Sequence, residues 1–236
     1  MRELDEAAAP NAIAQSVEVD ERKSLARRIR TCLALILFLH ITGASVIGQV
    51  YPKVVLDFYR GDDAGASTFN GWLTGLVSML QFVGVPGLSA ASDSIGRRTV
   101  MALALVMHSS SALLLAVNPS SILLVTVCQV ASSASAVLLP VSQAVIADLA
   151  RITGGGGSEL THGLGAVGAV FGLAIFVGPL LGGALSSFHA QAACLICATL
   201  CFLALLCLLW YGWEETARKP GLRRLACGAE AEAGAG

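Results

Sequence analysis

Charged residues are scarce in this sequence. Asp, Glu, Lys and Arg make up 13% of the 236 residues, whereas hydrophobic residues make up 55%. Soluble domains carry about 25% charged residues, so the deficit is typical of a protein that crosses a membrane several times. The formal net charge of −1 gives no indication of nucleic-acid binding, and we expect none.

Several chemical signatures are also missing. The glycines at 154–157 lack a preceding strand and a following Lys-Ser/Thr, so they predict a flexible loop and no phosphate cradle. The seven cysteines are scattered and suggest no disulfide framework. Cys194, Cys197 and Cys201 recur at helical spacing with no His or acid beside them, which favours small apolar filler over a thiolate metal site. No nucleophile–base or metal constellation appears, so we expect no enzyme, no catalytic residue, no metal and no cofactor.

Long hydrophobic runs are abundant. Six of them come near the ~20 residues that a helix needs to cross a bilayer. They cover residues 31–50, 69–88, 100–117, 122–147, 164–185 and 190–213. The runs are continuously apolar, without the alternation of a barrel strand. The sequence therefore predicts an all-α membrane protein with six transmembrane helices.

Basic residues lie mainly on one side of these runs. If both termini are cytoplasmic, every Lys and Arg falls on the inner side except Lys53 and Arg60. Those two share their outer loop with Asp57, Asp62 and Asp63. The positive-inside rule therefore predicts a multi-pass membrane protein with both termini in the cytoplasm.

The two ends of the chain differ from its hydrophobic middle. Residues 1–30 start acidic and Ala-rich and end in a basic cluster, which predicts a disordered cytoplasmic tail with a membrane-flanking anchor. An anionic-lipid or nucleic-acid site is the alternative interpretation of the cluster. The segment lacks the pattern of a signal peptide. Residues 31–213 then form the transmembrane domain, and 214–236 a second disordered cytoplasmic tail.

A short charged turn between the second and third runs carries the most specific motif, Asp93-x-x-Gly96-Arg97-Arg98. Gly96 can supply the positive φ of a tight turn, and the two arginines hold the turn on the inner side. With the preceding Gln-Phe-x-x-x-Pro at 81–86, the motif resembles the loop between helices 2 and 3 of the major facilitator superfamily. The resemblance is to its tetracycline and drug–proton antiporter branch. It implies that Asp93, Gly96, Arg97 and Arg98 control an inner gate.

Glycines recur through the fifth run. Gly165, Gly168 and Gly172 precede the motif Gly178-Pro179-x-x-Gly182-Gly183. Such spacing removes side chains from one helix face and lets another helix approach, while Pro179 permits a bend. The pattern resembles the helix-5 signature of the antiporters. The resemblance implies export-type transport and a bendable interface formed by Gly165, Gly178, Pro179, Gly182 and Gly183.

Polar side chains at membrane depth are candidates for a substrate or proton cavity. They are His40, Gln49, Gln81 and Gln129. His40 can be a satisfied core residue or a proton-titrating or substrate-facing group, since the reference pKa of histidine is near neutrality. The antiporters usually have Asp, Pro and Arg where this chain has His40, Gln49 and Gln129, which argues against proton coupling through the usual residues. His108 and the serines after it are expected to allow close helix contact.

The resemblance extends over residues 31–216, which corresponds to the N-terminal six-helix half of a twelve-helix fold. It implies transport of a small-molecule substrate across the lipid bilayer by alternating access, with proton coupling left open. A second six-helix half or a homodimer is then expected to complete the transporter. The alternative is a non-transporting half-transporter or truncated product that acts as a membrane interaction protein.

Overall fold

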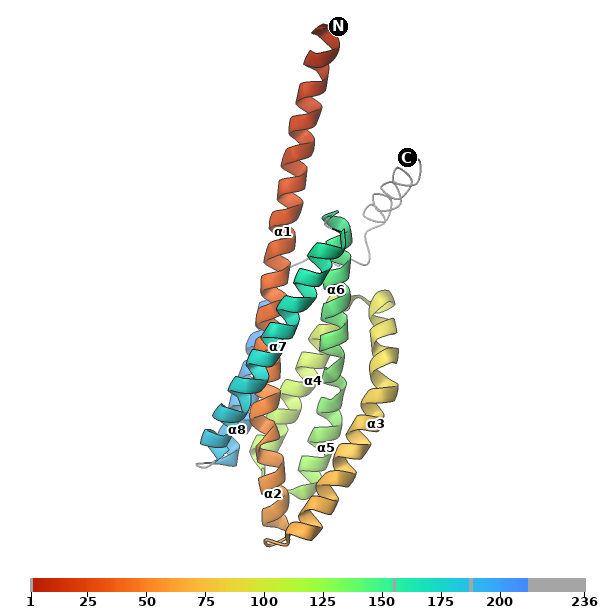
Figure 1. Ribbon diagram of the computed structural model, residues 1–236. Coiled ribbons are helices and arrows are strands. Elements are labelled where there is room, and N and C mark those ends of the chain that lie inside the picture. Colours follow the sequence, from red (N-terminus) through yellow and green to blue (C-terminus); the bar gives the residue numbers. More distant parts are fainter. Residues whose placement is uncertain (1, 155, 187–188, 212–236) are drawn as a thin grey trace.

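The computed structural model describes residues 2–154, 156–186 and 189–211, and the regular elements of these residues are all helical (Figure 1). They are α1 (Arg2–Gly48), α2 (Val50–Phe58), α3 (Asp63–Ile95), α4 (Arg97–Val117), α5 (Ile122–Ser132), the 3₁₀ segment η1 (Ser133–Val137), α6 (Leu138–Ile152), α7 (Gly156–Ser186) and α8 (Ala190–Trp210). Counting α1–α2 and α5–η1–α6 as single crossings, six helices of the described residues are long and apolar enough to span a bilayer. The predicted all-α fold with six transmembrane helices is confirmed.

The first crossing is broken near its C-terminal end. Pro52 has no N–H to donate to the carbonyl of Gly48, so the helical ladder is interrupted there. The structure accordingly ends α1 at Gly48, and the N–H of Gln49 turns back to the carbonyl of Val46 at 3.3 Å. The chain then continues as α2, and the whole crossing covers Lys23–Phe58, longer at both ends than the predicted run.

The N-terminal segment is helical up to Arg2, where the sequence predicts a disordered tail through residue 30. Ala26 and Ile29 are buried in the same apolar cluster as Leu33. Positions 26, 29 and 33 lie on one helix face, so they continue the apolar stripe of the crossing beyond the hydrophobic run. The tail predicted for 214–236 lies outside the described residues.

The fourth crossing is tightened in its middle. Pro140 removes the donor to the carbonyl of Ala136, and the hydroxyls of Ser132, Ser133 and Ser135 each donate to the carbonyl three residues earlier, at 3.0, 2.6 and 2.7 Å. Both effects favour the 3₁₀ segment η1 between α5 and α6. A serine-rich backbone segment is thereby placed in the middle of the fourth crossing.

The helices do not pack equally. α1 packs most extensively against α7 and α8, and α8 packs in turn against α4, whereas α3 lies along the opposite side of the bundle (Figure 1). Large apolar side chains on the outside are strongly exposed, including Trp72 at 78%, Phe82 at 83% and Trp210 at 89%. Such a surface is suited to lipid or to another membrane segment and would be an aggregation liability in water.

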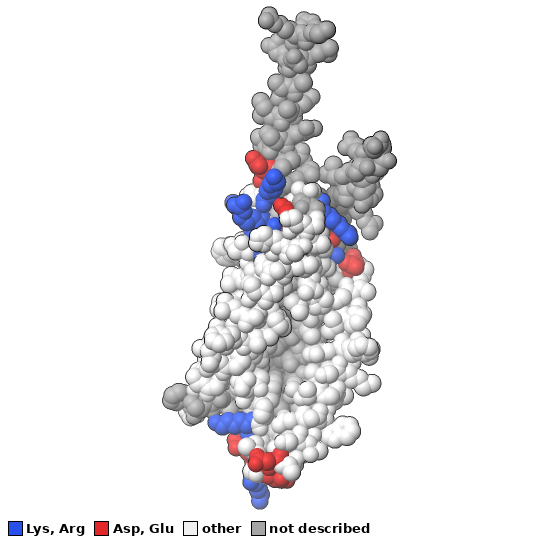
Figure 2. All heavy atoms as spheres, viewed as in Figure 1, with Lys and Arg blue, Asp and Glu red and all other residues white. Residues whose placement is uncertain are grey.

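The charged residues of the described chain gather at the two ends of the bundle, and the surface between them is almost free of charge (Figure 2). One end carries Arg30, Asp93, Arg97, Arg98, Asp148 and Glu159, whose contacts are described below. The α2–α3 turn with Lys53, Asp57, Arg60, Asp62 and Asp63 lies at the other end. This distribution is that of an integral multi-pass membrane protein.

Candidate functional site

A cavity of about 600 Å³ lies between α3 and the α1–α2 crossing, over α4, α5 and η1. Its polar lining consists of Tyr51, Ser67, Asn70, Thr74, Gln81, His108, Gln129, Ser132, Ser133 and Ser135. Ala44, Ile47 and Val77 add apolar surface. None of the described residues that line it is Asp, Glu, Lys or Arg. The cavity therefore offers many hydrogen-bonding groups and apolar contacts without a fixed charge.

The α3 wall of the cavity follows a simple sequence pattern. Ser67, Asn70, Thr74, Val77 and Gln81 recur at alternating steps of three and four residues, which places them on one helix face. Sequence reasoning singled out only Gln81. The polar stripe of Ser67, Asn70 and Thr74 was the signal that could have identified the rest of this wall.

Gln81 and Gln129, two of the predicted cavity residues, line this cavity. The Gln129 Oε1 atom is buried and accepts no hydrogen bond from the described residues. A buried amide oxygen without a donor is costly, so a partner from water or a ligand is expected. Gln129 is consequently the lining side chain with the clearest unused binding capacity.

The other two predicted cavity residues are located elsewhere. Gln49 is an exposed residue, and its Cγ lies 3.0 Å from where a Cβ on Gly182 would stand, so it packs at the contact of α1 with α7. His40 is only 6% exposed and lies in the interior of the bundle. Neither belongs to the cavity lining described above.

His108 does more than form the helix contact expected from the sequence. It lines the cavity, and its Nδ1 lies 2.9 Å from Ser135 Oγ of η1. The neighbouring serine follows the expectation, because the Ser109 hydroxyl donates to the carbonyl of Ala198 at 3.1 Å and ties α4 to α8. The sequence held no signal for His108, since its partners come from helices far along the chain.

The predicted inner loop is built around Gly96. This residue has φ 111°, a value that residues with a Cβ rarely adopt, and its N–H donates to the carbonyl of Ser92 at 3.0 Å. It caps α3 and allows α4 to begin at once with Arg97. The turn predicted from the motif is thus present in the structure.

Arg97 connects this loop to the fourth crossing. Its Nη2 donates to Asp93 Oδ1 at 3.1 Å, and its Nη1 lies 2.6 Å from Asp148 Oδ2 on α6, in ion-pair contact without hydrogen-bond alignment. The Arg97 side chain is 13% exposed and that of Asp148 22%, against 65% for Asp93. The link to Asp148 is the more shielded of the two and should therefore be the stronger.

Arg98 points to the other side of the loop. Its Nη2 donates to the carbonyl of Leu209 at 2.9 Å, at the C-terminal end of α8, where carbonyls lack helical partners and carry partial negative charge. The α3–α4 loop is therefore attached to both α6 and α8. The sequence predicted the loop residues but gave no indication of Leu209 as a partner.

A second charged contact closes the same end of the bundle. Arg30 of α1 pairs with Glu159 of α7 at 3.0 Å, and the Thr153 hydroxyl donates to the same carboxylate oxygen at 2.6 Å. One member of the predicted basic anchor thus binds within the protein. This contact joins α1 to the C-terminal end of α6 and the N-terminal part of α7.

The glycine motif of α7 divides into two groups. A Cβ on Gly178 would overlap Ser45 of α1, and a Cβ on Gly182 would come within 2.7 Å of the Val46 carbonyl oxygen, so these two glycines allow α7 to touch α1. A Cβ on Gly165 or Gly183 would meet nothing within 4 Å. Pro179 lies inside α7 between the two contact glycines.

These features agree with the comparisons to known proteins. The family model described as Major Facilitator Superfamily matches residues 33–226. The chain belongs to the Major Facilitator Superfamily. It is 29% identical over 187 residues to the class B tetracycline resistance protein of Escherichia coli, a match that covers 79% of this chain and 44% of that protein.

Two further relatives place this membership in context. The multidrug transporter protein MdtP of Bacillus subtilis is 26% identical over 153 residues, which cover 65% of this chain and 26% of that protein. The crystal structure of the human organic anion transporter MFSD10 (TETRAN) superposes with a TM-score of 0.65 at 23% identity, covering 81% of this chain and 48% of that one. This superfamily chain thus spans about half the length of the class B tetracycline resistance protein and of the solved transporter, and it has a half of the solved transporter's fold.

Proposed function

We propose that the chain transports a small molecule across a membrane by alternating access, as the N-terminal half of an export-type transporter. The observation that carries this proposal is a cavity of about 600 Å³ lined by Gln129, whose buried Oε1 atom has no donor among the described residues. Family membership supports the mechanism, because superfamily transporters bind substrate between two six-helix halves near the middle of the membrane.

The cavity lining favours a particular class of substrate. Gln129 needs a donor, Gln81 and Asn70 offer amides, and Ile47 and Val77 offer apolar surface. Without a charged lining residue in the described part, nothing in this half compensates a localised charge on the ligand. We therefore propose that the substrate is an amphipathic organic molecule with several hydrogen-bonding groups. Tetracycline, which the name of one relative mentions, is a molecule of this kind.

The charged loop is proposed as the inner gate, without direct substrate contact. Arg97 and Arg98 fasten it to α6 and α8, so the loop can transmit a tilt of α3 to both helices. A proton-coupled version of this mechanism would need a titrating group supplied by the second half, because the described cavity lining contains no acid.

A second set of six helices is proposed to complete the site, either from a homodimer or from another half-transporter. The outward side chains of α3 include Trp72, Met79 and Phe82, all strongly exposed, beside the cavity that Gln81 lines. Polar groups that face lipid are expensive, so a covering half would stabilise the cavity. The competing proposal is a membrane interaction protein that binds a partner and does not transport.

Efflux of tetracycline from vesicles reconstituted with the chain tests the proposal. Gln129→Ala and Gln81→Ala should each lower the efflux rate at least tenfold, because each removes a hydrogen-bonding group from the cavity. Gln49→Ala is the matched control, since Gln49 lies outside the cavity, and should stay within twofold. Equal rates for all three variants and the unaltered chain would contradict the assignment of the cavity.

The orientation is proposed to place both termini in the cytoplasm. It is supported by the distribution of basic residues, most of which stand before the first hydrophobic run, at the α3–α4 loop, at the end of α6 or after α8. Cys227 should then react with a membrane-impermeant maleimide only in permeabilised cells. Labelling of Cys227 in intact cells would reverse the proposed topology.

A further inference from the structure

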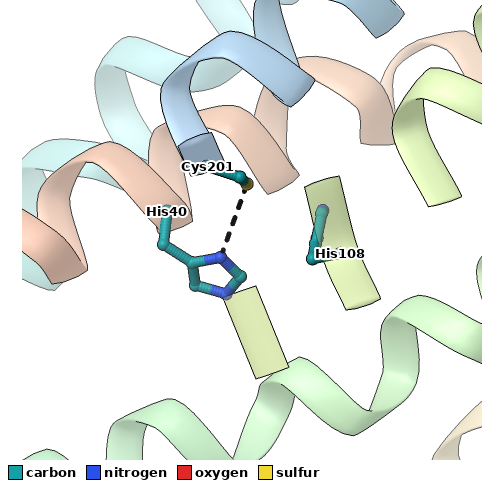
Figure 3. A group of neighbouring side chains, drawn as sticks. All are labelled: His40, His108 and Cys201. Atoms are coloured by element: carbon teal, nitrogen blue, oxygen red, sulfur yellow. Dashed lines mark hydrogen bonds between the residues drawn. The ribbon is translucent and has the colours of Figure 1, made fainter. Parts of the chain in front are cut away.

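Two histidines and two cysteines from three different helices converge inside the bundle. His40 Nδ1 of α1 lies 3.8 Å from Cys201 Sγ of α8, and His108 Nε2 of α4 lies 3.5 Å from Cys197 Sγ of α8. Ligand atoms of His40, His108 and Cys201 all lie within 4.8 Å of one another. Figure 3 shows His40 and Cys201 facing each other across a hydrogen bond, with His108 beside them. The sequence alone favoured small apolar filler for the cysteines, because no histidine stands near them in the chain.

We propose that His40, His108, Cys197 and Cys201 bind one zinc ion in a tetrahedral site. Zinc takes His nitrogen at about 2.0–2.1 Å and Cys sulfur at about 2.3 Å, which puts neighbouring ligand atoms about 3.3–3.8 Å apart. The two shortest N–S distances, 3.5 and 3.8 Å, already lie in this range. The separations among the ligand atoms of His40, His108 and Cys201 are at most 4.8 Å, and rotation of these side chains and of Cys197 would bring all four onto one ion.

The hydrogen bonds of His108 prepare it as a ligand. Ser135 Oγ lies 2.7 Å from the carbonyl oxygen of Ser132, an acceptor only, so the hydroxyl hydrogen is donated there. Ser135 Oγ can then only accept from His108 Nδ1, 2.9 Å away. The proton of His108 therefore sits on Nδ1, and Nε2 presents its lone pair toward Cys197. A ligating histidine whose other nitrogen donates to a protein group is the arrangement found in zinc sites.

The charge balance also favours zinc at this place. His40 and His108 are 6% and 4% exposed, and Cys197 and Cys201 are fully buried. Two thiolates and two neutral imidazoles around Zn²⁺ give a site without net charge, which keeps the cost of burying the ion in the membrane low. Hard cations such as Mg²⁺ prefer oxygen ligands and have none in this set.

The packing of α1 on α8 and the cavity complete the site. A Cβ on Gly43 would come within 3.3 Å of the Cys197 carbonyl oxygen, so Gly43 lets the two helices approach one turn from His40. His108 also lines the cavity, which gives an ion access to the cluster from the cavity side. Bound zinc would join α1, α4 and α8 at mid-membrane, independently of whether the chain transports.

Titration of the purified full-length chain with Co²⁺, a spectroscopic substitute for zinc, tests the proposal. One Co²⁺ per chain should bind with the absorption of a tetrahedral, thiolate-ligated ion, and one equivalent of Zn²⁺ should displace it. Cys201→Ser and His108→Gln should each weaken binding at least a hundredfold, and Ser135→Ala about 10–100-fold. Cys194→Ser is the control, because Cys194 is a fully buried cysteine of the same helix outside the cluster, and it should bind normally.

Alkylation of the unaltered chain gives a readout that does not depend on whether a variant folds. In partly denaturing detergent, Zn²⁺ should protect Cys197 and Cys201 from iodoacetamide and leave Cys194 and Cys128 as reactive as before. Absence of the thiolate absorption in the unaltered chain would overturn the proposal. Protection of Cys194 to the same degree as Cys201, or normal Co²⁺ binding by Cys201→Ser, would overturn it as well.

Discussion

The contact of α7 with α1 permits a prediction about individual glycines of one helix. In Gly182→Ala the new Cβ would stand 2.7 Å from the Val46 carbonyl oxygen and 3.0 Å from Val46 Cα, both backbone atoms. Backbone cannot turn aside as a flexible side chain can, so α7 must move away from α1. Overpacking of this kind costs about 1–3 kcal/mol.

The higher helix propensity of alanine changes the stability in the opposite direction. Replacing Gly by Ala inside a helix lowers the entropy cost of ordering the chain and contributes about 0.5–1 kcal/mol of stability. The net loss for Gly182→Ala therefore lies between about 0 and 2.5 kcal/mol, with a midpoint of about 1 kcal/mol. A Cβ on Gly172 would meet nothing within 4 Å, so Gly172→Ala keeps the gain without the clash and should be neutral or stabilising by up to about 1 kcal/mol.

Thermal unfolding of both variants in the same detergent, followed through thiol exposure, measures the difference. We expect Gly182→Ala to melt several degrees below the unaltered chain and Gly172→Ala to melt at or above it. Equal melting temperatures for the two variants would refute the assigned packing of α7 on α1. A lower value for Gly172→Ala alone would mean that the other face of α7 makes the close contact.

The inner loop gives two further predictions. Asp148→Asn should destabilise the chain by about 1–3 kcal/mol, because it leaves the shielded Arg97 guanidinium without its closest carboxylate. Asp93→Asn removes the exposed partner and should cost less than about 1 kcal/mol. The same unfolding assay compares the two variants, and a larger effect of Asp93→Asn would contradict this ranking. Gly96→Ala should lower the stability by about 1–3 kcal/mol, because alanine is strained at φ 111°. A Cβ on Gly87 would meet nothing within 4 Å, so Gly87→Ala should not destabilise the chain. Similar losses of stability at both positions would rule out backbone strain as the cause.

Local patterns predicted much of the fold. Continuous apolar runs gave the six crossings, because each must satisfy its backbone as a helix in lipid. Asp93 and Gly96 gave the inner turn, since the motif is short and its geometry is local. The break at Gln49 was also readable in principle, because Pro52 stands one turn after the last residue of α1.

Contacts between distant segments could not be predicted in the same way. Cys201 stands 161 residues from His40, and Cys197 stands 89 from His108, so only the packing of α1, α4 and α8 brings them together. The same holds for Gln49, whose position at the break between α1 and α2 turns it toward α7 and away from the cavity. A single residue's polarity shows that it needs a partner but leaves open which helix supplies one.

The central proposal is that this chain transports as one half of a larger assembly. Tetracycline efflux should therefore be measured in vesicles that contain from well below one to several copies of the purified chain. If two copies form the transporter, vesicles with fewer than one copy on average should be inactive, and the active fraction should rise with the square of the copy number. Full efflux per chain at the lowest density would contradict the account, because it would show that six helices suffice.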